Sequence, residues 1–275
     1  MLLPVLASLA LQQGPSSCCT SGMDQFLDDP SFAAMHMPPV PFAFQAKSGK
    51  MVHFKATDGK EANGFFVPAK SGNRSALLVF HEWWGLNDYI KQEAERLHDE
   101  LGSAVLAVDL YDGKVATTAE EAQKLMSAAD KDAARTTAIS NGARLAIQDG
   151  SLFKAGRIGT IGWCFGGGQS FWAAVNGGSA VNACVIYYGM PSTDPAVLAK
   201  LKAPVLMIWG TQDGFINSKV VDGFKAAMNK ARKSLQTVSY DAVHAFANPS
   251  NPKYDAADAA DAHRRTLAFL KPKLK

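Results

Sequence analysis

A cysteine flanked by glycines is the most reactive position that the sequence offers. Cys164 stands in the run GWCFG (162–166), between a predicted strand over residues 157–162 and a predicted helix over residues 167–175. The glycines permit a turn too tight for larger side chains, and such a turn lifts the thiol above the carboxyl-terminal edge of a sheet. The start of the helix favours a thiolate and a developing oxyanion at the same place. The pattern predicts a nucleophile, with a buried cysteine in a glycine-rich turn as the alternative.

A thiol nucleophile needs a base, and the base needs a group that orients it. Asp213 follows the predicted strand over residues 204–210, and His244 follows the predicted strand over residues 235–240. In sites built on a strand–turn–helix nucleophile, the chain order is nucleophile, acid, histidine, as it is here. We therefore expect Cys164, Asp213 and His244 to meet at one edge of a sheet as nucleophile, orienting acid and base.

The other histidines are weaker candidates for the base. His36 and His53 precede the core strands. His98 and His263 fall on predicted helices, where a solvated or capping role fits better. His81 is the rival to the base just described, because it also ends a predicted strand.

The segment HEWWG (81–85) follows a continuous apolar strand and takes the place of an oxyanion-hole loop. The backbone N–H groups of Trp83 and Phe165 are the expected donors to the oxyanion. Glu82 is expected in an aromatic-walled cleft beside the thiol, where its pKa is raised and it exchanges a proton with the sulfur. A surface carboxylate in a loop is the alternative for Glu82.

Strands alternate with helices along most of the chain, which predicts a mostly parallel sheet with helices on both faces. The sheet should have about eight strands, the first two antiparallel around the turn at residues 58–59. The expected strands are residues 51–56, 63–67, 76–80, 104–110, 157–162, 181–188, 204–210 and 235–240. The expected helices are residues 89–101, 118–147, 167–175, 195–199, 218–232 and 254–270.

The first 50 residues differ from the rest of the chain. Residues 1–20 hold an apolar run, residues 2–11, followed by small polar residues, which predicts either a signal segment or an N-terminal arm. We expect an exported protein, periplasmic or secreted, if residues 2–11 are a signal, and a cytoplasmic one otherwise. Residues 21–50 are predicted to be an irregular extension that lies on a main domain of residues 51–275.

Composition and charge exclude several classes of protein. The 275 residues are 47% hydrophobic, which is enough to form a large core. The net charge of +3 is too small to indicate nucleic-acid binding. Apart from the N-terminal run, no apolar stretch approaches the length of a membrane span. The four cysteines form no C-x-x-C pair, so no metal is expected. Cys18 and Cys19 are adjacent near the N-terminus. Cys184 lies in an apolar run and is expected to be a buried apolar residue.

Six motifs together resemble the dienelactone hydrolase family of α/β-hydrolases, over about residues 51–270. The resemblance implies the α/β-hydrolase fold and the triad Cys164, Asp213 and His244. It also implies that Glu82 is the carboxylate that holds or takes the thiol proton. The motifs are HEWWG (81–85), VDLYDG (108–113), GWCFGG (162–167), YYG (187–189), GTQDGF (210–215) and HAF (244–246).

Substrate recognition is where the chain departs from the family pattern. Family members that act on a lactone bearing a carboxylate have an arginine shortly after the histidine, and this chain has Asn248 there. The substitution removes a bidentate clamp for an anion. Tyr111 and Tyr188 match family tyrosines near the substrate. We assign Trp84 and Phe246, which belong to the same motifs, to the substrate site as well, with an ordinary core or cleft aromatic as the alternative for Trp84.

The sequence thus predicts a hydrolase of carboxylic esters or lactones that uses no cofactor and no metal. Its partner is a small-molecule substrate rather than a nucleic acid, and its assembly is a monomer or a homodimer. A non-catalytic ligand-binding or interaction module on the same scaffold is the alternative. The presence of all three triad residue types at strand ends argues against that alternative. For a cysteine peptidase or acyltransferase, nothing in the sequence supplies an extended peptide groove.

Overall fold

The computed structural model describes residues 22–26 and 29–275. The apolar run over residues 2–11, interpreted as a signal segment or an arm, lies outside the described residues, as do Cys18 and Cys19. None of the helices in the described part of the chain is long and apolar enough to cross a membrane.

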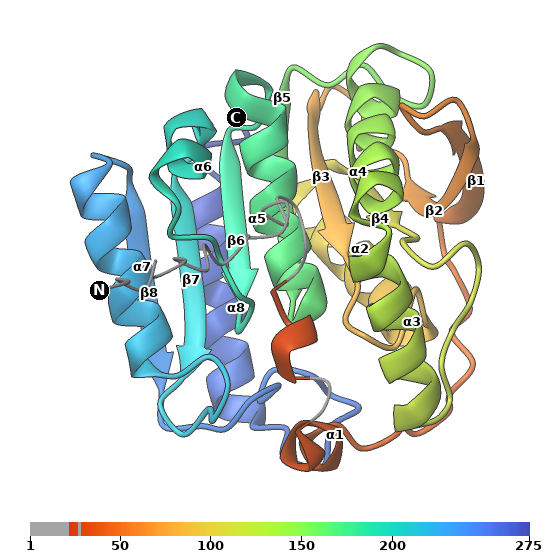
Figure 1. Cartoon of the computed structure of the whole chain (residues 1–275). Helices are drawn as coiled ribbons and strands as arrows, with labels where there is room; N and C mark the ends of the chain where they lie inside the picture. The colour runs from red at the N-terminus through yellow and green to blue at the C-terminus, as the bar shows by residue number, and fades with distance from the viewer. Residues whose placement is uncertain (1–21, 27–28) are drawn as a thin grey trace, which may run out of the picture.

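A single eight-stranded sheet forms the centre of the molecule (Figure 1). Its strands are β1 (Lys50–Lys55), β2 (Glu61–Val67), β3 (Ser75–Phe80), β4 (Ala104–Val108), β5 (Arg157–Trp163), β6 (Ala183–Tyr187), β7 (Val205–Gly210) and β8 (Leu235–Tyr240). They lie in the order β1-β2-β4-β3-β5-β6-β7-β8. β2 is antiparallel to both of its neighbours, and all other pairs are parallel. The predicted mostly parallel sheet with an antiparallel start is therefore confirmed.

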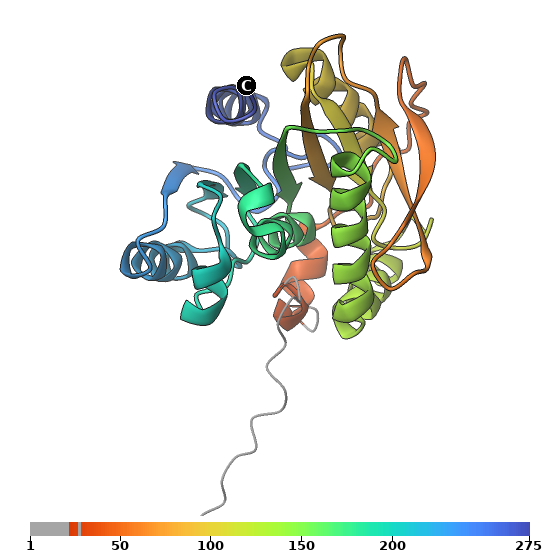
Figure 2. The same ribbon diagram turned by 90° about the horizontal axis from the view of Figure 1, so that it is seen from above.

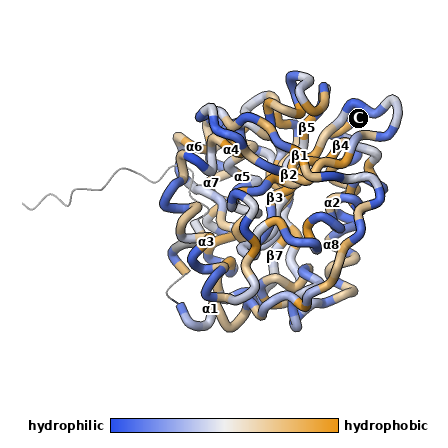
Figure 3. Tube along the Cα trace, turned by 90° about the vertical axis from the view of Figure 1, so that its right-hand side faces the viewer, coloured by the Kyte–Doolittle hydropathy of each residue, from blue (hydrophilic) through white to orange (hydrophobic). Residues whose placement is uncertain are grey.

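Helices cover both faces of this sheet (Figure 2). One face carries α2 (Asp88–Leu101) and α8 (Ala256–Leu270), and the other carries α3 (Ala119–Lys131), α4 (Ala133–Gln148), α5 (Phe165–Gly177), α6 (Pro195–Lys200) and α7 (Ser218–Lys230). Strands β3, β4, β6 and β7 are buried at every position, as expected of strands covered on both faces. The hydrophobic stretches accordingly gather at the centre of the molecule, inside more polar loops (Figure 3).

The predicted single helix over residues 118–147 is wrong, because α3 and α4 divide it. Asp132 ends α3 and begins α4. Its side chain accepts a hydrogen bond from the backbone N–H of Arg135 at 3.0 Å, which is an N-cap. The start of α3 lies where the sequence predicts it, since the hydroxyl of Thr118 accepts from the N–H of Glu121 at 3.2 Å.

Residues 29–49, which we call the N-terminal strap, cross the edge of the sheet at which the parallel strands end. The strap contains the short helix α1 (Pro30–Met35), and η1 (Asp24–Phe26) precedes it, where the sequence predicts an irregular extension (red in Figure 1). Phe32 is its buried anchor, with ring centroids 4.9 Å from Phe215 and 5.4 Å from Trp83. Asn251 adds a hydrogen bond to the carbonyl oxygen of Met35 at 3.1 Å.

A carboxylate of α2 holds the end of the strap. Glu95 is buried, and its Oε1 accepts from the backbone N–H groups of Lys47 at 2.9 Å and of Ser48 and Gly49 at 2.8 Å. Hydrogen bonds to a charged acceptor are stronger than those between neutral groups. The strap is therefore fixed to α2 as well as to the sheet edge.

Replacing Glu95 by alanine is expected to lower the free energy of unfolding by about 3 kcal/mol, because three backbone N–H groups lose a charged acceptor. Urea unfolding measures the change. Glu120→Ala is the matched control: this carboxylate pairs with Lys124 on the surface, with side chains 75% and 73% exposed, and should cost less than about 1 kcal/mol. Equal losses in the two variants would contradict the role of Glu95.

Candidate active site

Cys164 stands in a strained turn between β5 and α5. Its φ of 52° lies in the left-handed region that side-chain-bearing residues rarely adopt. The neighbouring glycines are required by close contacts: a Cβ at Gly162 would lie 2.0 Å from the carbonyl oxygen of Gly166, and one at Gly166 would lie 2.2 Å from that of Phe80. The chain therefore turns here as the glycine spacing predicts.

Asp213 and His244 form a buried hydrogen-bonded pair. Nδ1 of His244 donates to Oδ2 of Asp213 at 2.7 Å, and both side chains are 0% exposed. The other oxygen, Oδ1, accepts from the backbone N–H groups of Phe215 and Ile216 at 2.8 and 2.9 Å. Burial alone raises the pKa of Asp213, but the charge of His244 and these N–H groups outweigh it and hold the pKa below its usual value. The carboxylate is thus fixed in place, and because it binds Nδ1, the other ring nitrogen of His244, Nε2, is left for the nucleophile.

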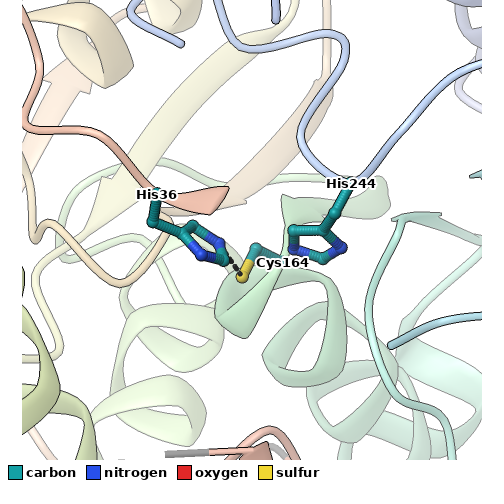
Figure 4. A group of neighbouring side chains, drawn as sticks. All are labelled: His36, Cys164 and His244. Carbon is teal, nitrogen blue, oxygen red and sulfur yellow. Dashed lines mark hydrogen bonds between the residues drawn. The ribbon is translucent and has the colours of Figure 1, made fainter. Parts of the chain in front are cut away.

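Cys164 lies between two imidazoles (Figure 4). The sulfur of Cys164 and one ring nitrogen each of His36 and His244 all lie within 4.8 Å of one another. Sγ of Cys164 is 3.6 Å from Nε2 of His36. Nε2 of His244 is buried and has no hydrogen-bond partner in the described part of the chain. The structure brings Cys164, Asp213 and His244 together. It also brings in His36, which precedes the core strands and which the sequence ranks among the weaker candidates.

The enclosure changes the protonation of these groups. Burial raises the pKa of the Cys164 thiol, while the charge of His244 acts in the opposite sense. Burial lowers the pKa of His36 to about 3, so its ring is neutral near pH 7. For His244, burial lowers the pKa, but the charges of Asp213 and Cys164 outweigh this effect and hold the pKa well above its usual value.

The strap closes the site. Cys164 and His244 are 0% exposed and His36 is 3% exposed. Phe32 of the strap lies over both imidazoles, with its ring centroid 4.4 Å from that of His36 and 6.2 Å from that of His244. With the strap in this position, the sulfur has no exposed surface for a substrate to reach.

Glu82 is a buried carboxylate rather than a surface one. The hydroxyl of Tyr188 donates to its Oε1 at 3.5 Å, and the amide of Asn248 donates to its Oε2. Burial raises the pKa of Glu82 to about 7. A pocket lined by Glu82, Trp84 and Asn248, among others, approaches this carboxylate. Glu82 is thus able to hold or release a proton near neutral pH.

The raised pKa of Glu82 predicts a pH-dependent stability. From its ordinary value near 4.5 up to about 7, the folded chain keeps a proton that the unfolded chain has lost. The free energy of unfolding should therefore fall as the pH rises through this window, by up to about 1.4 kcal/mol per pH unit. Urea unfolding of the unaltered chain and of Glu82→Gln, compared between about pH 5 and pH 7, isolates this contribution. Parallel pH dependences in the two proteins would refute it.

Two of the side chains predicted to line the substrate site lie beside His244 or beside Phe165, which follows Cys164. Tyr188 packs against the ring of His244, with centroids 5.1 Å apart, and Tyr111 packs against Phe165 at 5.6 Å. The hydroxyl of Tyr111 is buried without a hydrogen-bond partner among the residues that the structure describes. Trp83 and Phe165, the predicted oxyanion donors, are both 0% exposed. The four predicted substrate residues are all buried: Trp84, Tyr111, Tyr188 and Phe246.

The remaining histidine candidates have structural roles. Nδ1 of His81 donates to the carbonyl oxygen of Glu82 at 2.6 Å, and its Nε2 accepts from the N–H of Leu110 at 3.2 Å. Both ring nitrogens are therefore used, which removes His81 as a rival base. His98 and His263 lie on helices as predicted but are buried rather than solvated.

Comparison with known proteins places this geometry in a family. Residues 63–274 match the dienelactone hydrolase family. The chain belongs to that family. It is 30% identical over 220 residues to carboxymethylenebutenolidase from Pseudomonas putida, with 74% of this chain and 88% of the relative covered. It is 29% identical over 229 residues to protein usf of Aquifex pyrophilus, with 81% and 98% covered.

Solved structures of dienelactone hydrolases share the fold. A dienelactone hydrolase-like promiscuous phosphotriesterase from metagenomic libraries matches with a TM-score of 0.72 at 24% identity, covering 82% of this chain and 99% of that one. Dienelactone hydrolase from Anabaena variabilis matches with a TM-score of 0.62 at 19% identity, covering 83% and 100%. The α/β-hydrolase fold is confirmed, and family membership makes this protein a hydrolase of lactones or esters. The strap, with His36, lies outside the family match.

Proposed function

We propose that this dienelactone hydrolase family member cleaves a carboxylic ester or lactone through a thioester on Cys164. The observation that supports this most is the buried Asp213–His244 hydrogen bond of 2.7 Å, with a ring nitrogen of His244 within 4.8 Å of the sulfur. A thiol, an imidazole and a carboxylate in this order pass a proton from nucleophile to base, and the carboxylate stabilises the imidazolium that forms.

Acylation begins once the strap has moved aside. In the resting enzyme the Glu82 carboxylate, when ionised, exchanges the thiol proton with the sulfur. For acylation His244 accepts that proton, and Sγ attacks the carbonyl carbon of the substrate. The backbone N–H groups of Trp83 and Phe165 donate hydrogen bonds to the oxyanion. Protonated His244 then gives its proton to the departing alkoxide oxygen as the C–O bond breaks. The acyl group is left on Cys164 as a thioester.

Water completes the reaction. Neutral His244 takes a proton from a water molecule, whose oxygen attacks the thioester carbonyl. The C–S bond breaks, the carboxylic acid leaves, and the proton held by His244 returns to the sulfur. Asp213 keeps the imidazole in the tautomer that both half-reactions need.

Asn248 supports a substrate that carries no carboxylate beside the scissile bond. The side chain of Asn248 is neutral, and its amide N–H already donates to Glu82 rather than to a substrate. An anionic substrate needs a cationic partner when it leaves water, and arginine is the side chain best suited to that task. We therefore propose uncharged esters or lactones as the substrate class.

The function is tested with purified protein, para-nitrophenyl acetate, an uncharged lactone and a lactone that bears a carboxylate. We expect turnover of the first two, a lower kcat/KM for the third, and inactivation by iodoacetamide that parallels the appearance of an adduct on Cys164. A folded protein that turns over none of them, and whose Cys164 is not alkylated near neutral pH, would instead support a ligand-binding module.

A further inference from the structure

The hydrolytic mechanism leaves His36 without a task. Nδ1 of His36 donates to the carbonyl oxygen of Phe32 at 2.6 Å, so its Nε2 lone pair faces the sulfur of Cys164 at 3.6 Å. Nε2 of His244 is also buried and has no hydrogen-bond partner in the described part of the chain, while its Nδ1 donates to Asp213. Two ring nitrogens thus lie beside one sulfur in a buried enclosure. A buried polar atom without a partner is costly, and a cation in place of the proton would bind all three atoms.

We propose that Cys164, His36 and His244 form a binding site for a thiophilic divalent cation of the zinc type. Thiolate sulfur and imidazole nitrogen are the ligands that Zn²⁺ prefers. The cysteines are not arranged in a C-x-x-C pair, so the sequence alone predicts no metal. The site exists only because the strap packs where it places His36 beside Cys164.

The distances fit tetrahedral coordination. With Zn–S near 2.3 Å and Zn–N near 2.0–2.1 Å, tetrahedral angles place a sulfur and a nitrogen ligand about 3.6 Å apart. The distance between Sγ of Cys164 and Nε2 of His36 is 3.6 Å. Two imidazoles on one tetrahedral ion have ring centroids about 5 Å apart. Those of His36 and His244 are 5.0 Å apart, so small side-chain rotations bring all three ligands onto one ion.

The surroundings of the two imidazoles also suit a metal. Metal-binding histidines generally donate their second ring nitrogen to a carbonyl or a carboxylate, and His36 and His244 do so to Phe32 and Asp213. A divalent cation, the Cys164 thiolate and the Asp213 carboxylate sum to zero charge, so the buried ion is compensated. Three protein ligands leave a fourth position for water.

Cation binding would hold the enzyme closed. The ion displaces the thiol proton to solvent and takes the lone pairs of both Cys164 and His244, which removes nucleophile and base together. Because His36 belongs to the strap, the same ion ties the strap across the entrance. Removing the ion with a chelator would restore activity.

Co²⁺ is a suitable probe, because thiolate ligation gives a near-ultraviolet charge-transfer band and a tetrahedral site gives intense visible bands. The experiment uses the full-length chain with Cys18→Ser and Cys19→Ser, so that this adjacent pair of thiols does not compete for the ion. The protein is reduced and freed of metal. It is then titrated with Co²⁺ and afterwards with Zn²⁺. We expect one Co²⁺ per chain with both features, bleached by Zn²⁺. In this background Cys164→Ala should abolish the charge-transfer band, and His36→Ala should lower the affinity by at least about tenfold.

His53→Ala and Cys184→Ala are the matched controls. The first removes an exposed histidine and the second a buried thiol outside the site, so both should bind Co²⁺ like the parent. His36→Gln serves as a second variant if alanine loosens the strap, and urea unfolding checks each fold. Absence of the band in the parent, its persistence in Cys164→Ala, or parental affinity in both His36 variants overturns the proposal. These spectra need no turnover, so the result is independent of the proposed hydrolysis.

Discussion

Cys164→Ala is expected to reduce kcat/KM for ester hydrolysis by at least about ten-thousand-fold, because the atom that carries the acyl group is gone. Alanine adds no volume to a side chain that is 0% exposed, and it meets the φ of 52° at no greater cost than cysteine does. The fold should therefore survive. Initial rates with para-nitrophenyl acetate, together with urea unfolding of the same preparation, measure both quantities.

Cys184→Ala separates this loss from the removal of any buried thiol. Cys184 is also 0% exposed, on β6, with its sulfur 3.6 Å from the hydroxyl of Ser170. We expect its loss to cost about 1 kcal/mol of stability and to leave kcat/KM unchanged. If Cys164→Ala keeps the parental rate, or if both variants lose activity equally, Cys164 is not the nucleophile.

The inner strands are the part of the fold that the sequence predicts best. Residues 76–80 form one continuous apolar run because β3 is buried at every position, between two layers of helices. The boundary at Asp132 is harder to see, because the alanine-rich composition on both sides favours helix equally. There a local hydrogen bond to Arg135 decides where one helix ends and the next begins.

The candidate site divides in the same way. Asp213 and His244 follow parallel strands, so topology alone brings them to one edge. The place of His36 depends instead on Phe32 packing against Phe215, a contact between segments far apart in the sequence. Phe32 and His36 are four residues apart, just before a proline-rich stretch. This spacing predicts that the two side chains share one face of a helix, but it does not predict what that face packs against.

Closure of the site also follows from contacts rather than from pattern. A nucleophile turn exposes its side chain above the sheet edge, yet the sulfur of Cys164 has no exposed surface. The strap contributes to this enclosure, since the ring centroid of Phe32 lies 6.2 Å from that of His244. Glu95 holds the far end of the strap through backbone N–H groups. The side chains around the sulfur and His244 therefore include two, Phe32 and His36, from a segment that precedes the matched family region.

Asp213→Asn is expected to lower kcat by about a thousand-fold to ten-thousand-fold while leaving the fold intact. Oδ1 of Asp213 accepts from the N–H groups of Phe215 and Ile216, so the amide oxygen of asparagine must take that place. The amide NH₂ then faces Nδ1 of His244 and donates to it. The imidazole proton is forced onto Nε2, which can no longer accept the proton of the Cys164 thiol.

The tautomer is the quantity that tests this argument. Nitrogen NMR of labelled His244, recorded at a pH above the raised pKa of the ring, should report a proton on Nδ1 in the unaltered chain and on Nε2 in Asp213→Asn. The loss of activity should appear in kcat rather than in KM. Asp241→Asn is the matched control, since this exposed carboxylate accepts only from Thr211 and Gln212 among the contacts described for it. An unchanged tautomer with a full loss of activity would show that Asp213 acts through charge alone. An unchanged rate would remove Asp213 from the mechanism.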